Sequence, residues 1–211
     1  MSTASPDPAV GSSFKRTPEG WYKAVPSNET VEWAIQTTAA GDRTKPNNML
    51  NFSKNRAGGL VAEKAFHLWL EERQVAHVWN GGTDPKPDFQ IGSLRVGVKE
   101  CGRNDKPWNP RLVVNIYHRH KPLPLDEVFF VGYERITGKK TPEIDKERVV
   151  LLGGLTKDDY FDKATLVRKG GQINPDTPAQ NDVWNLKTRL LEPPDKWLER
   201  VLAAATAAAA G

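Results

Sequence analysis

The sequence has very little cysteine and no long apolar run. Cys101 is the one cysteine among 211 residues, which excludes an intramolecular disulfide and a cysteine-rich zinc module and is typical of a reducing compartment. No apolar run approaches the roughly 18 residues that a membrane-spanning helix needs, and the N-terminus has neither a basic start nor the apolar core of a signal peptide. We therefore expect a soluble, cytoplasmic protein with no membrane partner.

Residues able to form a core are also scarce at the two ends of the chain. Residues 1–13 are mainly Ser, Pro, Ala and Gly, and we expect residues 1–20 to be a disordered tail. The remaining length is enough for one domain, which we place at residues 21–202. Residues 203–211 form an Ala-rich tail that can continue a helix by propensity but has little to pack against.

Hydrophobic periodicity predicts a mixed order of helices and strands. The helix over residues 60–73 follows Gly58-Gly59 and has the clearest helical spacing of apolar residues. The other expected elements are a helix at 29–40, strands at 111–117, 127–134 and 146–154, a short helix at 159–164, a strand or turn at 182–191 and a helix at 195–202. This order describes an α/β sandwich in which a helix lies on a sheet.

A hairpin at residues 86–100 combines clear turn chemistry with reactive side chains. Gly92-Ser93 separates two segments of strand composition, which predicts a two-residue loop with a type II′ turn. The resulting register places Asp88 opposite Gly97 and puts Lys99 diagonally beside Asp88 on one polar face. The apolar face then consists of Phe89, Ile91, Leu94, Val96 and Val98.

Glu63 is a carboxylate at the margin of an apolar helix face. Its neighbours at helical spacing, Leu60 and Leu70, are both apolar. The alternative is an exposed glutamate that pairs with Lys64 or His67.

These side chains are suited to hydrolysis of a phosphodiester bond. A divalent cation can neutralise the phosphate and help to deprotonate a water, and Mg²⁺ needs few carboxylate ligands because it retains several waters. Glu63 and Asp88 supply two carboxylates, and Lys99 supplies a compact cation for the attacking water or a phosphate oxygen.

The arrangement resembles the restriction-endonuclease-like, or PD-(D/E)XK, nuclease superfamily. The matching residues are Glu63 in GLVAEKAF, Pro87-Asp88 at the start of the hairpin and Lys99 in RVGVKE, within a region of about residues 51–117. The resemblance implies a Mg²⁺- or Mn²⁺-dependent DNA endonuclease with a mixed central β-sheet flanked by helices. It also implies that Glu63 and Asp88 bind the metal together with the backbone carbonyl of Val98, and that Lys99 serves the water.

Gly97 departs from the superfamily pattern, which has an acidic residue two positions before the lysine. Asp84, in the segment TDPKPD, is a candidate replacement, whereas strand alternation points Glu100 to the opposite face from Lys99. A nucleic-acid-binding protein that has this fold but has lost catalysis is therefore the alternative function.

Basic residues are concentrated just after the hairpin. Seven lie between Arg95 and Lys121 against two acidic residues, in a chain with a net charge of +4. A solvated charged face is the alternative to a DNA-binding surface. The candidate DNA contacts are Arg95, Arg103, Lys106, Arg111 and Arg119, with Trp108 as a candidate for stacking on a base. A homodimer would suit double-strand cleavage, although no sequence feature indicates one.

His118 and His120 are spaced so that both could bind one metal ion. No second pair of ligands has a spacing typical of a zinc site. We expect these histidines to belong to the basic surface instead.

Overall fold

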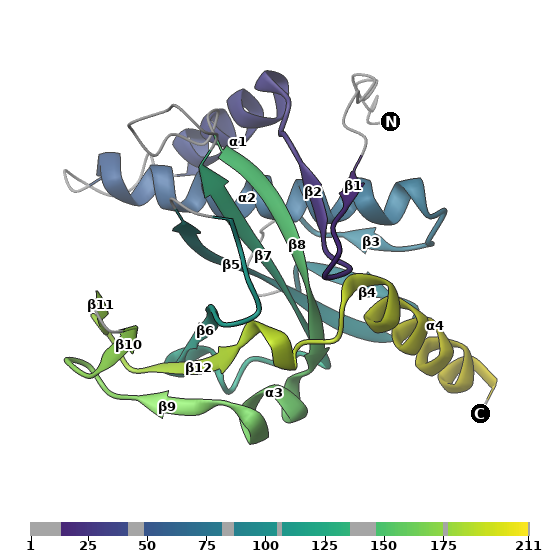
Figure 1. The fold of residues 1–211 in the computed structure, drawn as a ribbon. Coiled ribbons are helices and arrows are strands. Elements are labelled where there is room, and N and C mark those ends of the chain that lie inside the picture. The colour runs from purple at the N-terminus through teal and green to yellow at the C-terminus, as the bar shows by residue number, and fades with distance from the viewer. Residues whose placement is uncertain are drawn as a thin grey trace.

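The fold is built on a seven-stranded sheet that curls across the molecule (Figure 1). The computed structural model describes residues 14–41, 49–81, 87–104, 107–135, 147–174 and 177–210. Across the sheet the strands are β1 (Lys15–Arg16), β2 (Tyr22–Ala24), β8 (Glu147–Thr156), β7 (Glu127–Arg135), β5 (Leu94–Asn104), β4 (Phe89–Ile91) and β3 (Val78–Trp79). β5 and β7 are parallel, whereas the other neighbours are antiparallel, so the sheet is mixed.

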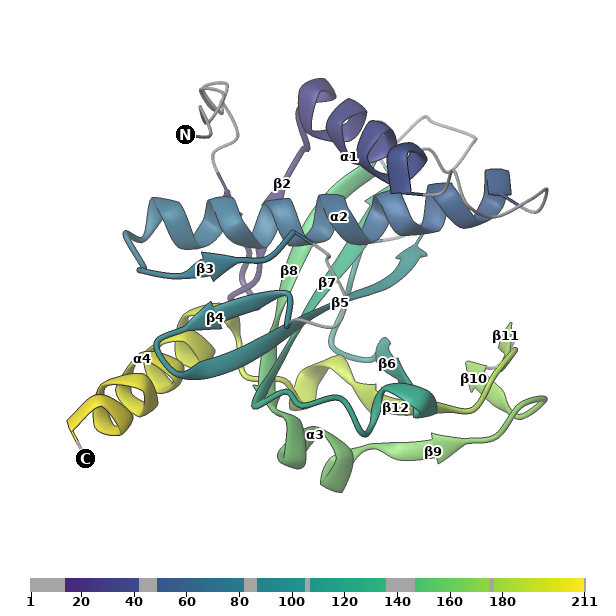
Figure 2. The same cartoon turned by 180° about the vertical axis from the view of Figure 1, so that it is seen from behind.

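Helices cover one face of this sheet, and a second sheet covers the other. The first face carries α1 (Asn28–Gly41), α2 (Met49–Glu72) and α4 (Pro194–Ala210), and Figure 2 shows β3 running alongside α2. The second face carries α3 (Lys157–Lys163) and a three-stranded sheet of β6 (Val113–Tyr117), β12 (Val183–Lys187) and β9 (Thr165–Val167). The remaining short elements are β10 (Gln172–Asn174), β11 (Thr177–Pro178) and the 3₁₀ turns η1 (His118–His120) and η3 (Thr188–Leu190). The expected α/β fold with a mixed central sheet and flanking helices is confirmed.

Both faces of the central sheet are buried. In β7, Phe129 and Val131 belong to the core beneath α2 and α4, whereas Val128 and Phe130 belong to the core beneath the second sheet. Side chains on a strand alternate between faces, so a strand covered on both sides has a continuous apolar run. Among the described residues, no helix is long and apolar enough to cross a membrane.

The β4-β5 hairpin has the predicted register. Ile91 pairs with Leu94, and Phe89 pairs with Val96. Gly92 has a φ of 57°, whereas Ser93 does not have a positive φ, which is the pattern of a type II′ turn. The expected apolar face is confirmed in the core beneath α2, where Phe89, Ile91, Val96 and Val98 are buried and Leu94 packs against them.

Helix α2 is much longer than the sequence pattern indicates. The expected start at residue 60 is wrong, because α2 begins at Met49 and runs through Gly58 and Gly59. Each interior glycine costs a helix about 1 kcal/mol, and tertiary packing overrides this cost here. Ala57 is buried at this point, and the hydroxyl of Tyr133 in β7 donates a hydrogen bond to the Gly58 carbonyl.

The turn after α2 reverses the chain with a glutamine where glycine is usual. Gln74 has a φ of 55°, and it is the one non-glycine residue with a positive φ in the described ranges. The amide of Val75 donates to the Leu70 carbonyl at 3.1 Å, and the amide of Gln74 donates to the Glu71 carbonyl at 2.9 Å. These two bonds form a Schellman motif, which ends the helix and directs the chain back toward β3.

Replacing Gln74 with glycine is expected to raise the free energy of unfolding by about 0.5–1 kcal/mol, because glycine adopts the left-handed conformation without a Cβ clash. Urea denaturation measures the difference. The matched control is Gln36→Gly in α1, where glutamine is exposed and helical, and this change should lower the free energy of unfolding by about 1 kcal/mol. Destabilisation by Gln74→Gly would contradict the prediction.

The two chain ends contribute more structure than the sequence indicates. Lys15 and Arg16 form β1, so part of the segment expected to be a tail pairs with β2, while residues 1–13 lie outside the described residues. The Ala-rich segment continues α4 to Ala210. A Cβ placed on Gly92 would lie 2.8 Å from the Cβ of Ala205, so α4 packs directly on the hairpin turn.

Candidate functional site

The candidate site lies where β4 and β5 separate. Pro87 and Asp88, just before β4, are bound to Asn80, which follows β3. The Asn80 backbone amide donates to the Asp88 carbonyl at 2.9 Å, and Asn80 Nδ2 donates to the Pro87 carbonyl at 2.7 Å. The pairing of β4 with β5 ends at Phe89 and Val96, so the amide of Val98 has no backbone partner in β4. Asp88 Oδ2 accepts its hydrogen bond at 2.7 Å, which fixes the carboxylate at the fork between the strands.

Lys99 and Asp88 are brought together, as the hairpin register predicts. Lys99 Nζ lies 3.7 Å from Asp88 Oδ2, and the two side chains are 19% and 21% exposed. A pair that is partly buried but still open to water is weakly screened, and it remains accessible to a ligand. The fork therefore combines a fixed carboxylate with a neighbouring ammonium group.

The backbone carbonyl of Val98 belongs to the same fork. In an antiparallel pair the N–H and C=O groups of one residue point to the same side of its strand. The Val98 amide points to Asp88, so its carbonyl also points to that side, beyond the last paired residue of β4, Phe89. The Asp88 carboxylate and the Val98 carbonyl are therefore on the same side of β5.

Gly97 is closely packed. A Cβ on Gly97 would lie 2.5 Å from Leu125 Cδ1 and 3.4 Å from Lys99 Nζ. Leu125 therefore occupies the space that the side chain of an acidic residue at position 97 would need, and the Lys99 ammonium lies beside this space. Asp84, the candidate replacement, lies outside the described residues.

Glu63 lies on the α2 side of the hairpin. It is 9% exposed, so the expectation of an exposed glutamate is wrong. Its Oε2 accepts a hydrogen bond from Trp79 Nε1 at 3.1 Å, and Trp79 pairs with Phe89, the residue after Asp88. Trp79 therefore connects Glu63 to the strand that carries Asp88.

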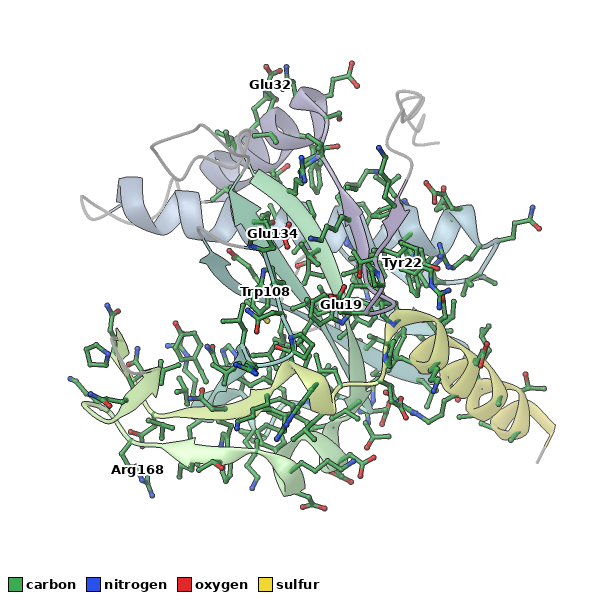
Figure 3. The ribbon with its side chains drawn as sticks, viewed as in Figure 1. Glu19, Tyr22, Glu32, Trp108, Glu134 and Arg168 are labelled. Atoms are coloured by element: carbon green, nitrogen blue, oxygen red, sulfur yellow. The ribbon has the colours of Figure 1, made fainter. Side chains whose placement is uncertain are left out.

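Trp108 corrects one expectation from the sequence. The side chain is 5% exposed, and its Nε1 donates to the Tyr133 carbonyl at 3.0 Å. Its backbone amide donates to Glu134 Oε1 at 2.7 Å, and Figure 3 shows Trp108 and Glu134 close together. A Cβ on Gly132 would lie 2.4 Å from the indole ring. Trp108 is a core residue packed on glycine, and its ring is not available to stack on a base.

The predicted basic contacts have different environments. Arg95 forms a bidentate ion pair with Asp126, with Nε–Oδ2 and Nη2–Oδ1 distances of 2.9 Å. The Arg95 hydrogen bond holds the pKa of the Asp126 carboxyl below its ordinary value. Arg111 and Arg119 are exposed, and the Arg119 guanidinium lies 5.1 Å from the centroid of the Tyr117 ring. The Arg103 side chain and Lys106 lie outside the described residues.

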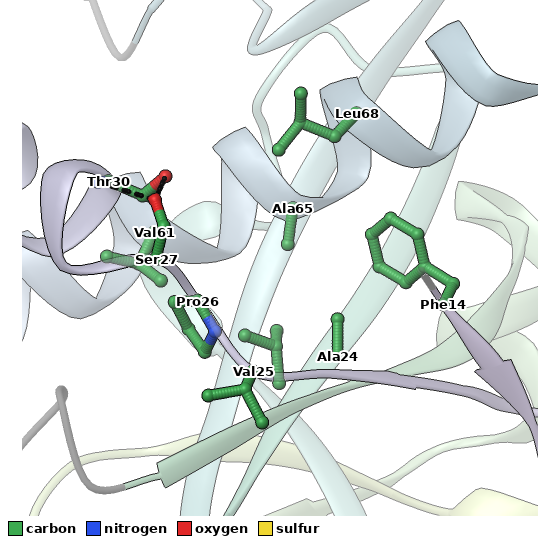
Figure 4. Close-up of a pocket in the computed structure, with 10 residues that line it drawn as sticks. Phe14, Ala24, Val25, Pro26, Ser27, Thr30, Val61, Ala65 and Leu68 are labelled. Atoms are coloured by element: carbon green, nitrogen blue, oxygen red, sulfur yellow. Dashed lines mark hydrogen bonds between the residues drawn. The ribbon is translucent and has the colours of Figure 1, made fainter. Parts of the chain in front are cut away.

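Two hollows among the described residues differ in their capacity for a ligand. A surface cavity of about 220 Å³ is lined by Tyr117, His118, Arg119, Asn181 and Asp182, within the basic surface. The second, between β2, α1 and α2, has apolar walls that include Phe14, Val61 and Leu68 (Figure 4). Its volume of about 10 Å³ has room for one water at most, so this crevice is not a substrate site.

Cys101 is inert in this environment. It is 1% exposed. Burial raises the pKa of its thiol, and the nearby negative charge of Glu100 raises this pKa further. A protonated, buried thiol is a poor nucleophile. Cys101 is therefore a structural residue of the core beneath the second sheet.

The chain was compared with protein-family models, with curated proteins and with solved structures, and none of the three comparisons gave a significant match.

Proposed function

We infer that the chain is a metal-dependent nuclease with a restriction-endonuclease-like core, and that it hydrolyses phosphodiester bonds of DNA. The observation that carries the inference is the fork between β4 and β5. There an aspartate carboxylate is fixed by the Val98 amide, and Lys99 Nζ lies 3.7 Å from it. The parallel pair of β5 with β7 and the packing of α2 on this sheet support the same core.

The groups at the fork fit the preferences of Mg²⁺ or Mn²⁺. Asp88 would bind the ion through its carboxylate, the Val98 carbonyl would be a second ligand, and Glu63 is the candidate for a third. Few protein ligands suffice because Mg²⁺ retains several waters. Such an ion would neutralise charge on the phosphate and lower the pKa of a bound water.

Lys99 has two roles that its position supports. Its ammonium can hold a phosphate oxygen, or it can orient the attacking water and exchange a proton with it. Asp88 keeps the ammonium at the fork through the 3.7 Å contact. Leu125 and the Lys99 ammonium both lie beside Gly97.

The second candidate function is binding of DNA without cleavage, and Gly97 favours it. A carboxylate at this position would stand opposite Asp88, and Leu125 occupies that space. Arg111 and Arg119, which are exposed, are candidate DNA contacts in either case. This candidate predicts salt-sensitive DNA binding with no turnover.

The test is cleavage of plasmid, single-stranded and branched DNA by the purified full chain. We expect cleavage of at least one of these DNAs with Mg²⁺ or Mn²⁺, and none after EDTA is added. Binding of DNA without metal-dependent cleavage of any of the three would exclude the nuclease and support the second candidate.

A further inference from the structure

A cluster of two histidines and a glutamate lies at the C-terminal end of α2. His67, Glu71 and His77 each offer a ligand atom, and these atoms lie within 4.8 Å of one another. His67 and Glu71 are one helical turn apart, so they share a face of α2. The left-handed turn at Gln74 reverses the chain and places His77 over this face.

The hydrogen bonds of the cluster orient the His77 imidazole as a ligand. His77 Nδ1 lies 2.7 Å from the Val75 carbonyl, which can only accept, so Nδ1 carries the proton and Nε2 has its lone pair. This Nε2 lies 2.8 Å from His67 Nδ1. A backbone carbonyl bound to the far nitrogen is the usual outer partner of a metal-binding histidine.

Ring packing holds the two histidines in place. The His67 ring stacks on Trp79 with a centroid separation of 4.8 Å, and the His77 ring lies 6.0 Å from that of Phe89. The two imidazoles meet edge to face at 5.1 Å. The two imidazoles are therefore already ordered, so binding of an ion would cost little of their side-chain entropy.

We propose that His67, Glu71 and His77 form a zinc site, with His67 Nδ1, His77 Nε2 and a Glu71 carboxylate oxygen as ligands. Two nitrogens bound to a tetrahedral Zn²⁺ at about 2.0–2.1 Å are roughly 3.3 Å apart. The 2.8 Å separation must open by about 0.5 Å, and the neutral His67 must move its proton to Nε2. Glu71 is exposed and can rotate toward the ion.

The donor set favours Zn²⁺ over Mg²⁺. Imidazole nitrogens suit Zn²⁺, Ni²⁺ and Cu²⁺, whereas Mg²⁺ prefers oxygen ligands. Two histidines and one glutamate leave a fourth position for water. A bound ion would tie the end of α2 to the segment leading into β3, whose Trp79 contacts Glu63. None of the three zinc ligands belongs to the proposed nuclease site.

Zn²⁺ titration of the full chain, in excess Mg²⁺, tests the site by calorimetry. The wild type should bind one Zn²⁺, and Zn²⁺ at about 100 times its dissociation constant should raise the unfolding temperature by roughly 5 °C or more. Co²⁺ should give the visible absorption of a tetrahedral complex. His77→Ala should weaken binding at least about 100-fold, more than the loss of an outer hydrogen-bond partner does.

Glu71→Gln is the gentler variant, because Glu71 is exposed and the change preserves its shape. It should weaken Zn²⁺ binding at least about 10-fold. Glu72→Gln, its exposed neighbour on α2, and His118→Ala, on the basic surface, should leave the affinity unchanged. The proposal is overturned if the wild type does not bind Zn²⁺ in a 1:1 ratio, or if His77→Ala and Glu71→Gln bind it as tightly as the controls.

Discussion

Replacement of Lys99 with methionine is expected to lower the rate of metal-dependent DNA cleavage by at least about 100-fold, the usual minimum contribution of a positioned proton-transfer group. Methionine has a similar length but no charge, so it removes the ammonium 3.7 Å from Asp88 Oδ2 while keeping the apolar stem. Because Lys99 also fills space beside Gly97, a long side chain is a better test than alanine.

The matched control for this prediction is Lys163→Met. Lys163 also pairs with an aspartate, at 3.4 Å from Asp159, but the pair is exposed on α3. Cleavage rates on the substrate that the wild type prefers, measured with DNA binding and the unfolding temperature, separate a catalytic effect from a folding effect. Equal rates for Lys99→Met and Lys163→Met would contradict a catalytic role for Lys99.

Replacement of Glu127 with alanine is expected to lower the free energy of unfolding by about 3 kcal/mol, toward the lower end of the range for breaking a buried ion pair. Glu127 is 3% exposed. It accepts from Arg200 at 2.6 and 2.9 Å and from Trp197 Nε1 at 3.0 Å, which ties α4 to the start of β7. Glu127 raises the pKa of Arg200. A guanidinium stays protonated even without such a partner, so Glu127→Ala leaves the arginine charged.

Glu192→Ala is the control, because Glu192 binds the same guanidinium through Nε at 2.8 Å but is 34% exposed. An exposed ion pair contributes about 1 kcal/mol at most. Urea denaturation of both variants gives the comparison. If Glu127→Ala lowers the free energy of unfolding by no more than Glu192→Ala does, the buried network does not hold α4 as described.

Features governed by neighbouring residues could be predicted from the sequence. The register of the hairpin follows from Gly92-Ser93 and from the two-residue period of a strand. The contact between Asp88 and Lys99 could therefore be predicted. The helix cap at Thr156 is another local feature, and its Oγ1 accepts from the Asp159 amide at 3.1 Å. In these cases the residues that determine the structure are within a few positions of one another.

Features governed by distant residues could not be predicted. Trp108, in the connection between β5 and β6, is buried because Gly132 in β7 leaves room for its ring. The second sheet exists because residues 113–117 pair with residues 183–187 across a long separation in sequence. Glycines in α2 are tolerated because the helix packs on the sheet, which outweighs a local propensity.

The histidine cluster illustrates a signal that was present but incomplete. His67 and Glu71 are four residues apart on a predicted helix, which is a spacing that can hold a metal ion. His77 joins them through a left-handed glutamine. Because glutamine rarely adopts this conformation, nothing in the local pattern indicates the reversal.

The most direct test of the proposed nuclease is a Mg²⁺ titration of DNA cleavage by the wild type and by Asp88→Asn. Asparagine keeps an oxygen that can accept from the Val98 amide, as Asp88 Oδ2 does at 2.7 Å, but it lacks the charge that binds Mg²⁺. The account predicts Mg²⁺-dependent cleavage by the wild type that EDTA abolishes, and at most about 1% of that rate for a folded Asp88→Asn variant. Cleavage by both proteins at the same rate, or by neither on any DNA, would contradict it.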